Sequence, residues 1–108
     1  MTLAELNTKL KAITGFADKV TYYAWPEGKA PALPFICFFE TGADNFAADG
    51  IVFSSSPSVA VELYTKLKDQ ATEQLVEAAL TSAGLYYTKQ EQYLGDEKCF
   101  FVLYNVNL

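Results

Sequence analysis

The sequence predicts an α+β fold: a single domain over residues 1–108, with a mostly antiparallel sheet and two helices packed on one face in the order αββββαββ. The length of 108 residues suits one domain with one hydrophobic core. Aromatic residues make up 15% of the chain, and they gather in runs of the kind that form strands. Two other segments repeat apolar residues at helical spacing and are bounded by capping residues.

The first helix is predicted to begin directly after Thr2. Thr2 and Glu5 form a capping box, in which each side chain accepts a hydrogen bond from the backbone amide of the other residue. Apolar residues then recur at helical spacing, namely Leu3, Leu6, Leu10 and Ile13. Gly15 ends this run, and we expect the apolar stripe to pack on the sheet.

Two strands are predicted next, over residues 19–24 and residues 35–41. The second is apolar on both faces, so we expect it inside the sheet rather than at its edge. The segment between them carries three prolines and a glycine and is therefore a loop. Trp25 lies in this loop, where it is either a contact residue or a lid on the core.

Residues 51–54 and 58–67 form the third and fourth predicted strands, separated by a bend or bulge at the serine run that precedes Pro57. The fourth strand alternates in polarity. Its apolar face is predicted to carry Val59, Val61, Leu63 and Leu67, and its other face Ser58, Glu62, Tyr64 and Lys66.

Asp69 is the expected cap of the second helix, which Gly84 ends. The buried side of this helix is predicted to comprise Leu75, Val76, Ala79, Leu80 and Ala83. Residues 85–93 and 98–108 then form a hairpin about a turn at residues 94–97. In the last strand one face is predicted to carry Phe100, Val102, Tyr104, Val106 and Leu108.

Composition disfavours several functional classes. The net charge is −5 and the chain has neither histidine nor arginine, whereas nucleic-acid readers use basic patches and arginine forks. We therefore expect no sequence-specific nucleic-acid partner, and the acidic balance and short apolar runs predict no membrane partner. Because the commonest general base and the usual zinc ligand are missing, we expect no enzyme, no catalytic residues, no metal and no cofactor.

The two cysteines, Cys37 and Cys99, both lie in apolar strand runs. The N-terminal segment carries charges among its apolar residues and is not a signal peptide. We therefore predict two buried, reduced thiols rather than a disulfide.

Residues 44–50 form an acidic and aromatic connection between two predicted strands. Asp44 and Asp49 are the best metal-ligand candidates, but apolar residues occupy the positions where a calcium loop places further oxygen ligands. A turn is favoured by Asp44, Asn45 and Gly50, yet a turn alone does not account for Phe46. We predict a protein-contact loop made by Asp44, Asn45, Phe46 and Asp49, with Trp25 as a further contact residue.

The segment "DNFAADGIVFSSSPSVAVELYTKLKDQATEQLVEAAL" resembles a small protein of the morphogenesis modules of long-tailed phages and prophages of Gram-positive bacteria. The likeness rests on the aspartate-asparagine-phenylalanine loop and on the "VELYTKLKD" run, and it extends through "FICFFE" and "YYTKQEQYLGDEKCFFVLYNV". It therefore covers most of the chain. The run "SSSPSVAV" departs from the family, where polar and charged residues are more usual.

This family is similar to the lambda-type tail terminators, also called tail completion proteins. The resemblance implies a non-enzymatic virion structural protein that caps the tail tube, ends its polymerisation and joins the tail to the head. It implies a homo-oligomeric ring of six copies, with the tail tube protein and the head-completion or connector protein as partners. It also implies synthesis in the bacterial host cytoplasm and a place in the virion at the tail end that faces the head. Another neck or minor capsid component, or a small ligand- or peptide-binding module, stays open as an alternative.

Overall fold

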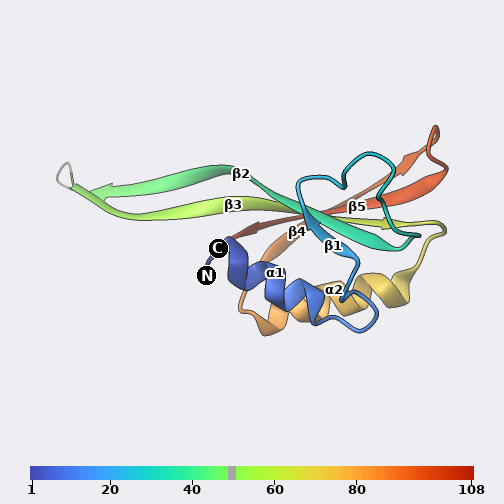
Figure 1. The fold of residues 1–108 in the computed structure, drawn as a ribbon. Helices are drawn as coiled ribbons and strands as arrows, with labels where there is room; N and C mark the ends of the chain where they lie inside the picture. The colour runs from blue at the N-terminus through green and yellow to red at the C-terminus, as the bar shows by residue number, and fades with distance from the viewer. Residues whose placement is uncertain (49–50) are drawn as a thin grey trace.

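The computed structural model describes residues 1–48 and 51–108, and it describes the side chains outside residues 43–56 (Figure 1). Two helices and a five-stranded mixed sheet confirm the α+β fold. The elements in chain order are α1 Leu3–Lys11, β1 Val20–Tyr22, β2 Phe35–Ala48, β3 Ile51–Thr65, α2 Gln70–Ser82, β4 Tyr87–Leu94 and β5 Cys99–Asn107.

The sheet has the strand order β1-β2-β3-β5-β4. Only the pair of β1 and β2 is parallel, and the other three pairs are antiparallel, as the sequence predicted. β2 is an interior strand, also as predicted, and β1 and β4 form the two edges.

The predicted element order is wrong at one point, because the third and fourth predicted strands are a single strand, β3. Pro57 does not break it. β5 pairs with β3 in register from Ser58 onward, and Pro57 lies just past the end of that register, where its carbonyl accepts a last hydrogen bond from the Leu108 amide. The end of a pairing is a place where a strand tolerates proline. The observed order is therefore αβββαββ.

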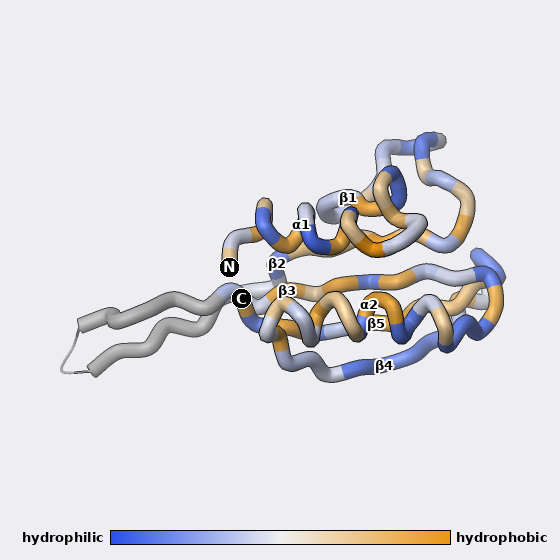
Figure 2. The backbone as a smooth tube through the Cα atoms, turned by 90° about the horizontal axis from the view of Figure 1, so that it is seen from below, coloured by the Kyte–Doolittle hydropathy of each residue, from blue (hydrophilic) through white to orange (hydrophobic). Residues whose placement is uncertain are grey.

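Both helices lie on the same side of the sheet, next to each other (Figures 1 and 2). The capping box of Thr2 and Glu5 is present, and the Asp69 side chain accepts a hydrogen bond from the amide of Thr72 at 3.0 Å. The helices and the sheet share one core, whose fully buried side chains include Leu6, Leu10, Ile36, Phe38, Val61, Leu63, Val76, Leu80, Val102 and Tyr104. Figure 2 shows apolar residues along the part of β3 that lies beneath the helices.

Three predictions about side chains and element ends are wrong. Leu67 lies beyond the end of β3 and is 73% exposed, because β3 ends at Thr65. Leu75 is 44% exposed, although the sequence predicts it on the buried side of α2. The buried residues of α2 are Glu73, Val76 and Leu80.

The third wrong prediction concerns the first strand, which spans three residues instead of six. Tyr23 has a φ of 70°, so the chain turns away from the sheet directly after Tyr22.

The two thiols are buried and unpaired, as predicted, with Cys37 5% and Cys99 3% exposed. Cys37 is in β2 and Cys99 in β5, and β3 lies between these strands. Two strand spacings are about 9.6 Å, which exceeds the separation of about 7 Å that a disulfide spans. The sheet itself therefore keeps the thiols apart.

The far ends of β2 and β3 project from the body as a long hairpin (Figure 1). The two strands remain paired from Gly42 with Ser58 out to Ala48 with Ile51, and the molecule measures 50 × 27 × 23 Å as a result. We call residues 41–48 and 51–57 the hairpin arm. Neither helix extends along it (Figure 1).

Candidate functional site

The structure places most of the predicted contact loop in a strand. The backbones of Asp44, Asn45 and Phe46 belong to β2, where they pair with Ser56, Ser55 and Ser54 of β3. The prediction of a seven-residue loop is therefore wrong, because pairing continues to Ala48. The side chains of Asp44, Asn45 and Phe46, and the whole of Asp49, lie outside the described residues, so their contact role stays a prediction.

Trp25 is not brought together with the hairpin arm. Its indole packs edge-on against Phe35, with ring centroids 6.0 Å apart, at the opposite end of β2 from Phe46. Eleven residues of strand separate Phe35 from Phe46, which is roughly 35 Å. Trp25 is half-buried, and among the described residues its indole N–H has no hydrogen-bond partner.

The face of the sheet opposite the helices carries an aromatic row that the sequence analysis did not identify. The row consists of Trp25, Phe35, Tyr64 and Phe101 and runs from the β1–β2 loop across β2, β3 and β5. The ring centroids of Phe35 and Tyr64 are 5.0 Å apart, and those of Tyr64 and Phe101 are 5.2 Å apart. The register creates most of the row, because Phe35, Tyr64 and Phe101 lie directly opposite one another on neighbouring strands, and Trp25 adds to it from the loop.

A carboxylate lies beside this row. Glu62 is two residues from Tyr64, whose hydroxyl donates a hydrogen bond to Glu62 Oε1 at 3.1 Å. Burial raises the pKa of Glu62, and the hydrogen bond from Tyr64 offsets part of that effect. Burial and the neighbouring Glu62 charge raise the pKa of Cys37, its direct cross-strand partner, to about 11. This thiol is therefore protonated at neutral pH and is a poor nucleophile.

The strongest cluster of charges lies between α2 and β4. Glu73 is 1% exposed and binds the ammonium groups of Lys68 and Lys89, each at 2.8 Å. Burial alone would raise the pKa of Glu73, but the hydrogen bonds and charges of the two lysines outweigh it, so that pKa lies below its ordinary value. Lys89 also binds Glu77 at 2.7 Å, and Lys68 binds Glu91 at 2.5 Å.

This cluster anchors α2 to the edge strand and offers no free acid or base. The Tyr104 hydroxyl donates to Glu77 Oε2 at 2.7 Å, so each carboxylate of α2 in the cluster is already bound by at least two donors. Although burial opposes the effect, the bound lysines lower the pKa of both carboxylates, which makes each of them a weaker base. Among the described residues, no group of three potential metal-ligating side chains is close enough to hold an ion.

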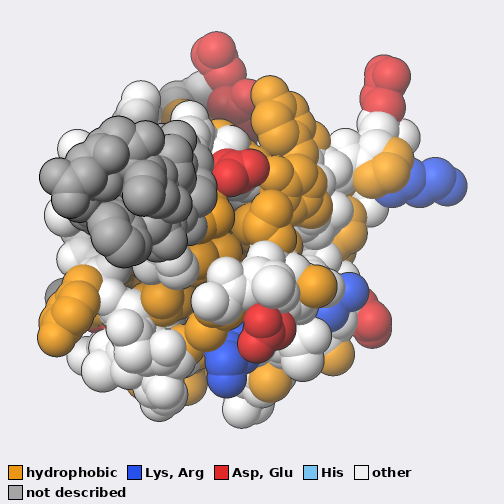
Figure 3. Space-filling view, turned by 90° about the vertical axis from the view of Figure 1, so that its left-hand side faces the viewer, with side chains coloured by type: hydrophobic (Ala, Val, Ile, Leu, Met, Phe, Trp, Pro, Cys, Tyr) orange, Lys and Arg blue, Asp and Glu red, His pale blue; other side chains and the backbone are white. Residues whose placement is uncertain are grey.

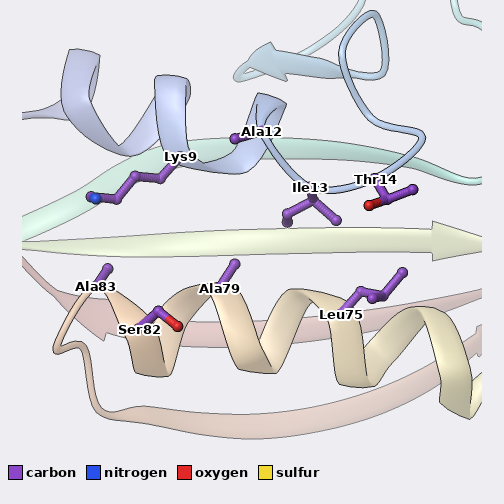
Figure 4. Close-up of a pocket in the computed structure, with 8 residues that line it drawn as sticks. All are labelled: Lys9, Ala12, Ile13, Thr14, Leu75, Ala79, Ser82 and Ala83. Carbon is purple, nitrogen blue, oxygen red and sulfur yellow. The ribbon is translucent and has the colours of Figure 1, made fainter.

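The groove between the two helices is also unlike a catalytic pocket (Figure 4). Its volume is about 310 Å³, and it is lined by Lys9, Ala12, Ile13 and Thr14 from the α1 side and by Leu75, Ala79, Ser82 and Ala83 from the α2 side. Figure 4 shows small side chains along α2 and Lys9 extended along the other wall. Substrate sites place several polar groups around one point, and this lining does not.

The edges of the sheet offer backbone groups rather than side chains. β1 pairs with β2 only from Ile36 to Phe38, so the outer edge of β2 has no strand beside it further along, within the described part of the chain. The backbone amide of Glu40 donates a hydrogen bond to the Tyr22 hydroxyl at 3.2 Å, so this amide points away from β3, toward the outer side of β2. Tyr22 and Tyr23, 47% and 68% exposed, lie beside it.

Seen from the left-hand side of Figure 1, hydrophobic side chains gather in a band on this end of the molecule (Figure 3). At the other edge, β4 is exposed along almost its whole length. The half-buried aromatic row, the hairpin arm and the two edges therefore provide several distinct surfaces suited to contacts with other protein chains.

Comparison of the chain with protein-family models and with curated proteins finds no match. None of the helices in the described residues is long and apolar enough to cross a membrane.

Proposed function

We propose that this chain is a non-enzymatic structural protein of the virion of a long-tailed phage, which caps the tail tube, ends its polymerisation and joins the tail to the head. It does so as a homo-oligomeric ring, six-fold by the family resemblance, whose two faces meet the tail tube protein and the head-completion protein. The chain is made in the bacterial host cytoplasm and resides in the virion at the tail end that faces the head.

The observation that carries this proposal is the hairpin arm. An isolated two-stranded hairpin is at best marginally stable in water, because it lacks a third strand or a covering layer. Within the described residues the arm has neither, since β1 and β5 both stop before it begins. An arm of this kind gains the missing strand or covering layer when the chain assembles, and a neighbouring subunit in a ring would supply it.

The charges of the molecule are compatible with a ring around DNA. Its net charge is −5, and every basic residue is a lysine. Among the lysines, Lys68 and Lys89 are bound to carboxylates of the same chain. A surface of this kind lets DNA pass without gripping its phosphates.

A ligand- or peptide-binding module is the second candidate, and the aromatic row is the observation that favours it. Phe35, Tyr64 and Phe101 form a half-buried aromatic surface, on the face of the sheet away from the helices, of the kind that binds apolar or extended ligands. In a ring the same surface is a contact between copies or with the tail tube. The two functions differ in whether the row is covered in the assembled state.

A capping experiment tests the proposal. Tail tube protein of the same phage is allowed to polymerise with and without this chain, and tube lengths are measured by electron microscopy. We expect shorter tubes that carry a ring at one end and do not resume growth when fresh subunits are added. Tubes of unchanged length that never carry the chain at their ends would reject the capping function.

A further inference from the structure

The hairpin arm lacks a neighbour on the outer edge of β2. From residue 41 to residue 48 this edge pairs with no strand of the described chain, and β1 ends opposite Phe38. These residues belong to β2, and those from Gly42 to Ala48 are already paired on their inner side with β3, after a bulge at Thr41. They therefore need one further strand, on one defined side.

The opposite edge of the same sheet offers a strand of the same length. β4 spans Tyr87–Leu94, eight residues without proline, and it pairs with β5 in an unbroken register. Natural edge strands usually prevent pairing with other chains by charged side chains, proline, bulges or shortness. β4 carries two charges, but Lys89 and Glu91 bind Glu73, Glu77 and Lys68 on the helix side.

The remaining side chains of β4 leave its open face neutral. Thr88, Gln90 and Gln92 alternate with the charged pair and are all exposed. The outer backbone edge of β4 is therefore long and regular, and its two charged side chains are bound within the same chain. Such an edge is a site for strand addition.

The strand directions of the two edges match. β5 is antiparallel to β3, and β3 is antiparallel to β2, so β5 runs with β2 and β4 runs against it. When a second copy is placed beside the first in the same orientation, its β2 edge therefore meets β4 in the antiparallel sense. Because the two edges are on opposite sides of one sheet, the contact is head-to-tail, the kind that closes into a ring.

We propose that neighbouring copies join by sheet extension, in which the outer edge of residues 41–48 of one copy pairs antiparallel with β4 of the next. This inference rests on the proposed ring and names the surface that builds it. The occupant of β4 is a second copy of this chain, because the same chain supplies a strand of equal length, opposite direction and complementary edge. The contact also gives the hairpin arm its third strand.

The faces of the sheet limit the register of this pairing. Gly42 pairs with Ser58, which pairs with Asn107, so Gly42 belongs to the open face opposite the helices. Gln92 and Leu94 belong to the same face, since they pair with Phe101 and Cys99. If the two sheets continue without a change of face, and residues 41–48 overlap β4 along nearly its whole length, Gly42 lies opposite Gln92 or Leu94. Gln92 is then a direct or diagonal neighbour of Gly42.

Cross-linking between two variants tests the contact. A Cβ atom built at Gly42 meets nothing within 4 Å, so Gly42→Cys fits the fold, and Gln92→Cys is at an exposed position. A tagged Gly42→Cys chain and an untagged Gln92→Cys chain are mixed under conditions where light scattering shows assembly, then treated with a short thiol-to-thiol linker. Wild-type protein controls for the two buried native thiols, and Lys11→Cys on α1 in place of Gln92→Cys is the matched control away from the sheet.

We expect a product that contains one tagged and one untagged chain, at least tenfold more abundant than with the Lys11→Cys control. The doubly substituted chain should give a ladder of linked copies, and each single variant alone should stay unlinked. Assembled protein that gives no such product overturns the sheet extension and leaves the ring intact. If Gln92→Cys chains link to each other, β4 of one copy meets β4 of another. If Gln92→Cys links only to tail tube protein, that protein occupies the β4 edge. Either result overturns the inference. A chain that never assembles, with or without tail tube protein, overturns the ring and this contact together.

Discussion

Removing the hairpin arm should abolish assembly and leave the body folded. The variant replaces residues 43–57 with Asn-Gly, a two-residue turn that joins antiparallel strands without splaying them. Gly42 and Ser58 are direct cross-strand partners, so the new turn closes a ladder position that already exists. The buried core of the body, from Leu6 to Val106, contains no described side chain of the removed segment.

The expected loss of stability can be worked from the contacts that the body loses. The clearest is the hydrogen bond from the Leu108 amide to the Pro57 carbonyl, 2.9 Å long. A backbone hydrogen bond of this kind contributes about 1 kcal/mol net. A change of about 1 kcal/mol lowers the melting temperature of a domain of this size by about 4–8 °C.

Self-association should change much more than stability. If the arm supplies a strand to the next copy, its removal should cost at least about 2 kcal/mol of association, or roughly 30-fold in Kd. Calorimetric melting and light scattering after size exclusion measure the two effects on one sample. A truncated chain that assembles at the wild-type concentration would refute the reasoning, and one that no longer melts cooperatively would show that the arm is part of the core.

Four further predictions concern single features. Phe46→Ala should change the free energy of unfolding by no more than about 0.5 kcal/mol but weaken self-association or tail tube binding by about 2 kcal/mol. Melting and light scattering measure the two effects, and a large loss of stability with unchanged association would make Phe46 a core residue. Cys37 and Cys99 should react slowly with a thiol reagent in the native protein and quickly after denaturation, because both are buried and the pKa of Cys37 is about 11; rapid native labelling would contradict their burial. Glu73→Gln should lose about 1–3 kcal/mol of stability at neutral pH. Because the folded pKa of Glu73 lies below its unfolded pKa, the ionised carboxylate stabilises the fold above the unfolded pKa, and this contribution is lost as the pH falls through the folded pKa. Chemical denaturation should therefore show the stabilities of the two proteins converging in acid, and a difference that stays constant with pH would reject the ionic role. Duplex DNA should bind weakly in a fluorescence titration even at low salt, given the net charge of −5, and a sequence-specific complex at physiological salt would overturn the structural role.

Local patterns predicted the fold where neighbours in the chain decide the structure. The capping box at Thr2 and the cap at Asp69 formed as predicted because each uses atoms within one turn. The alternation of Val59, Val61 and Leu63 placed them in the core, since a strand turns every second side chain to the same face.

Prediction failed where distant segments decide. The serine run and Pro57 suggested a break, but pairing with residues of β2 carries β3 through them. Glu73 is buried because Lys89, sixteen positions later in β4, neutralises it, and no helical periodicity shows that partner.

The contact surface was predicted only in part, for the same reason. The sequence predicts a contact loop at residues 44–50 and Trp25 as a further contact residue of the same kind, whereas the structure places Trp25 and Phe46 near opposite ends of β2. The aromatic row needs the registers of three strands, so Phe35, Tyr64 and Phe101 become neighbours only once the sheet is known.

The native mass of the purified chain, measured with and without its tail tube protein, tests the ring most directly. Light scattering across a range of concentrations should show a closed assembly that stops at one size. A six-fold ring has a mass of about 71 kDa, six times the 11.9 kDa chain mass. A chain that stays at 11.9 kDa at high concentration, and also in the presence of tail tube protein, would contradict the account.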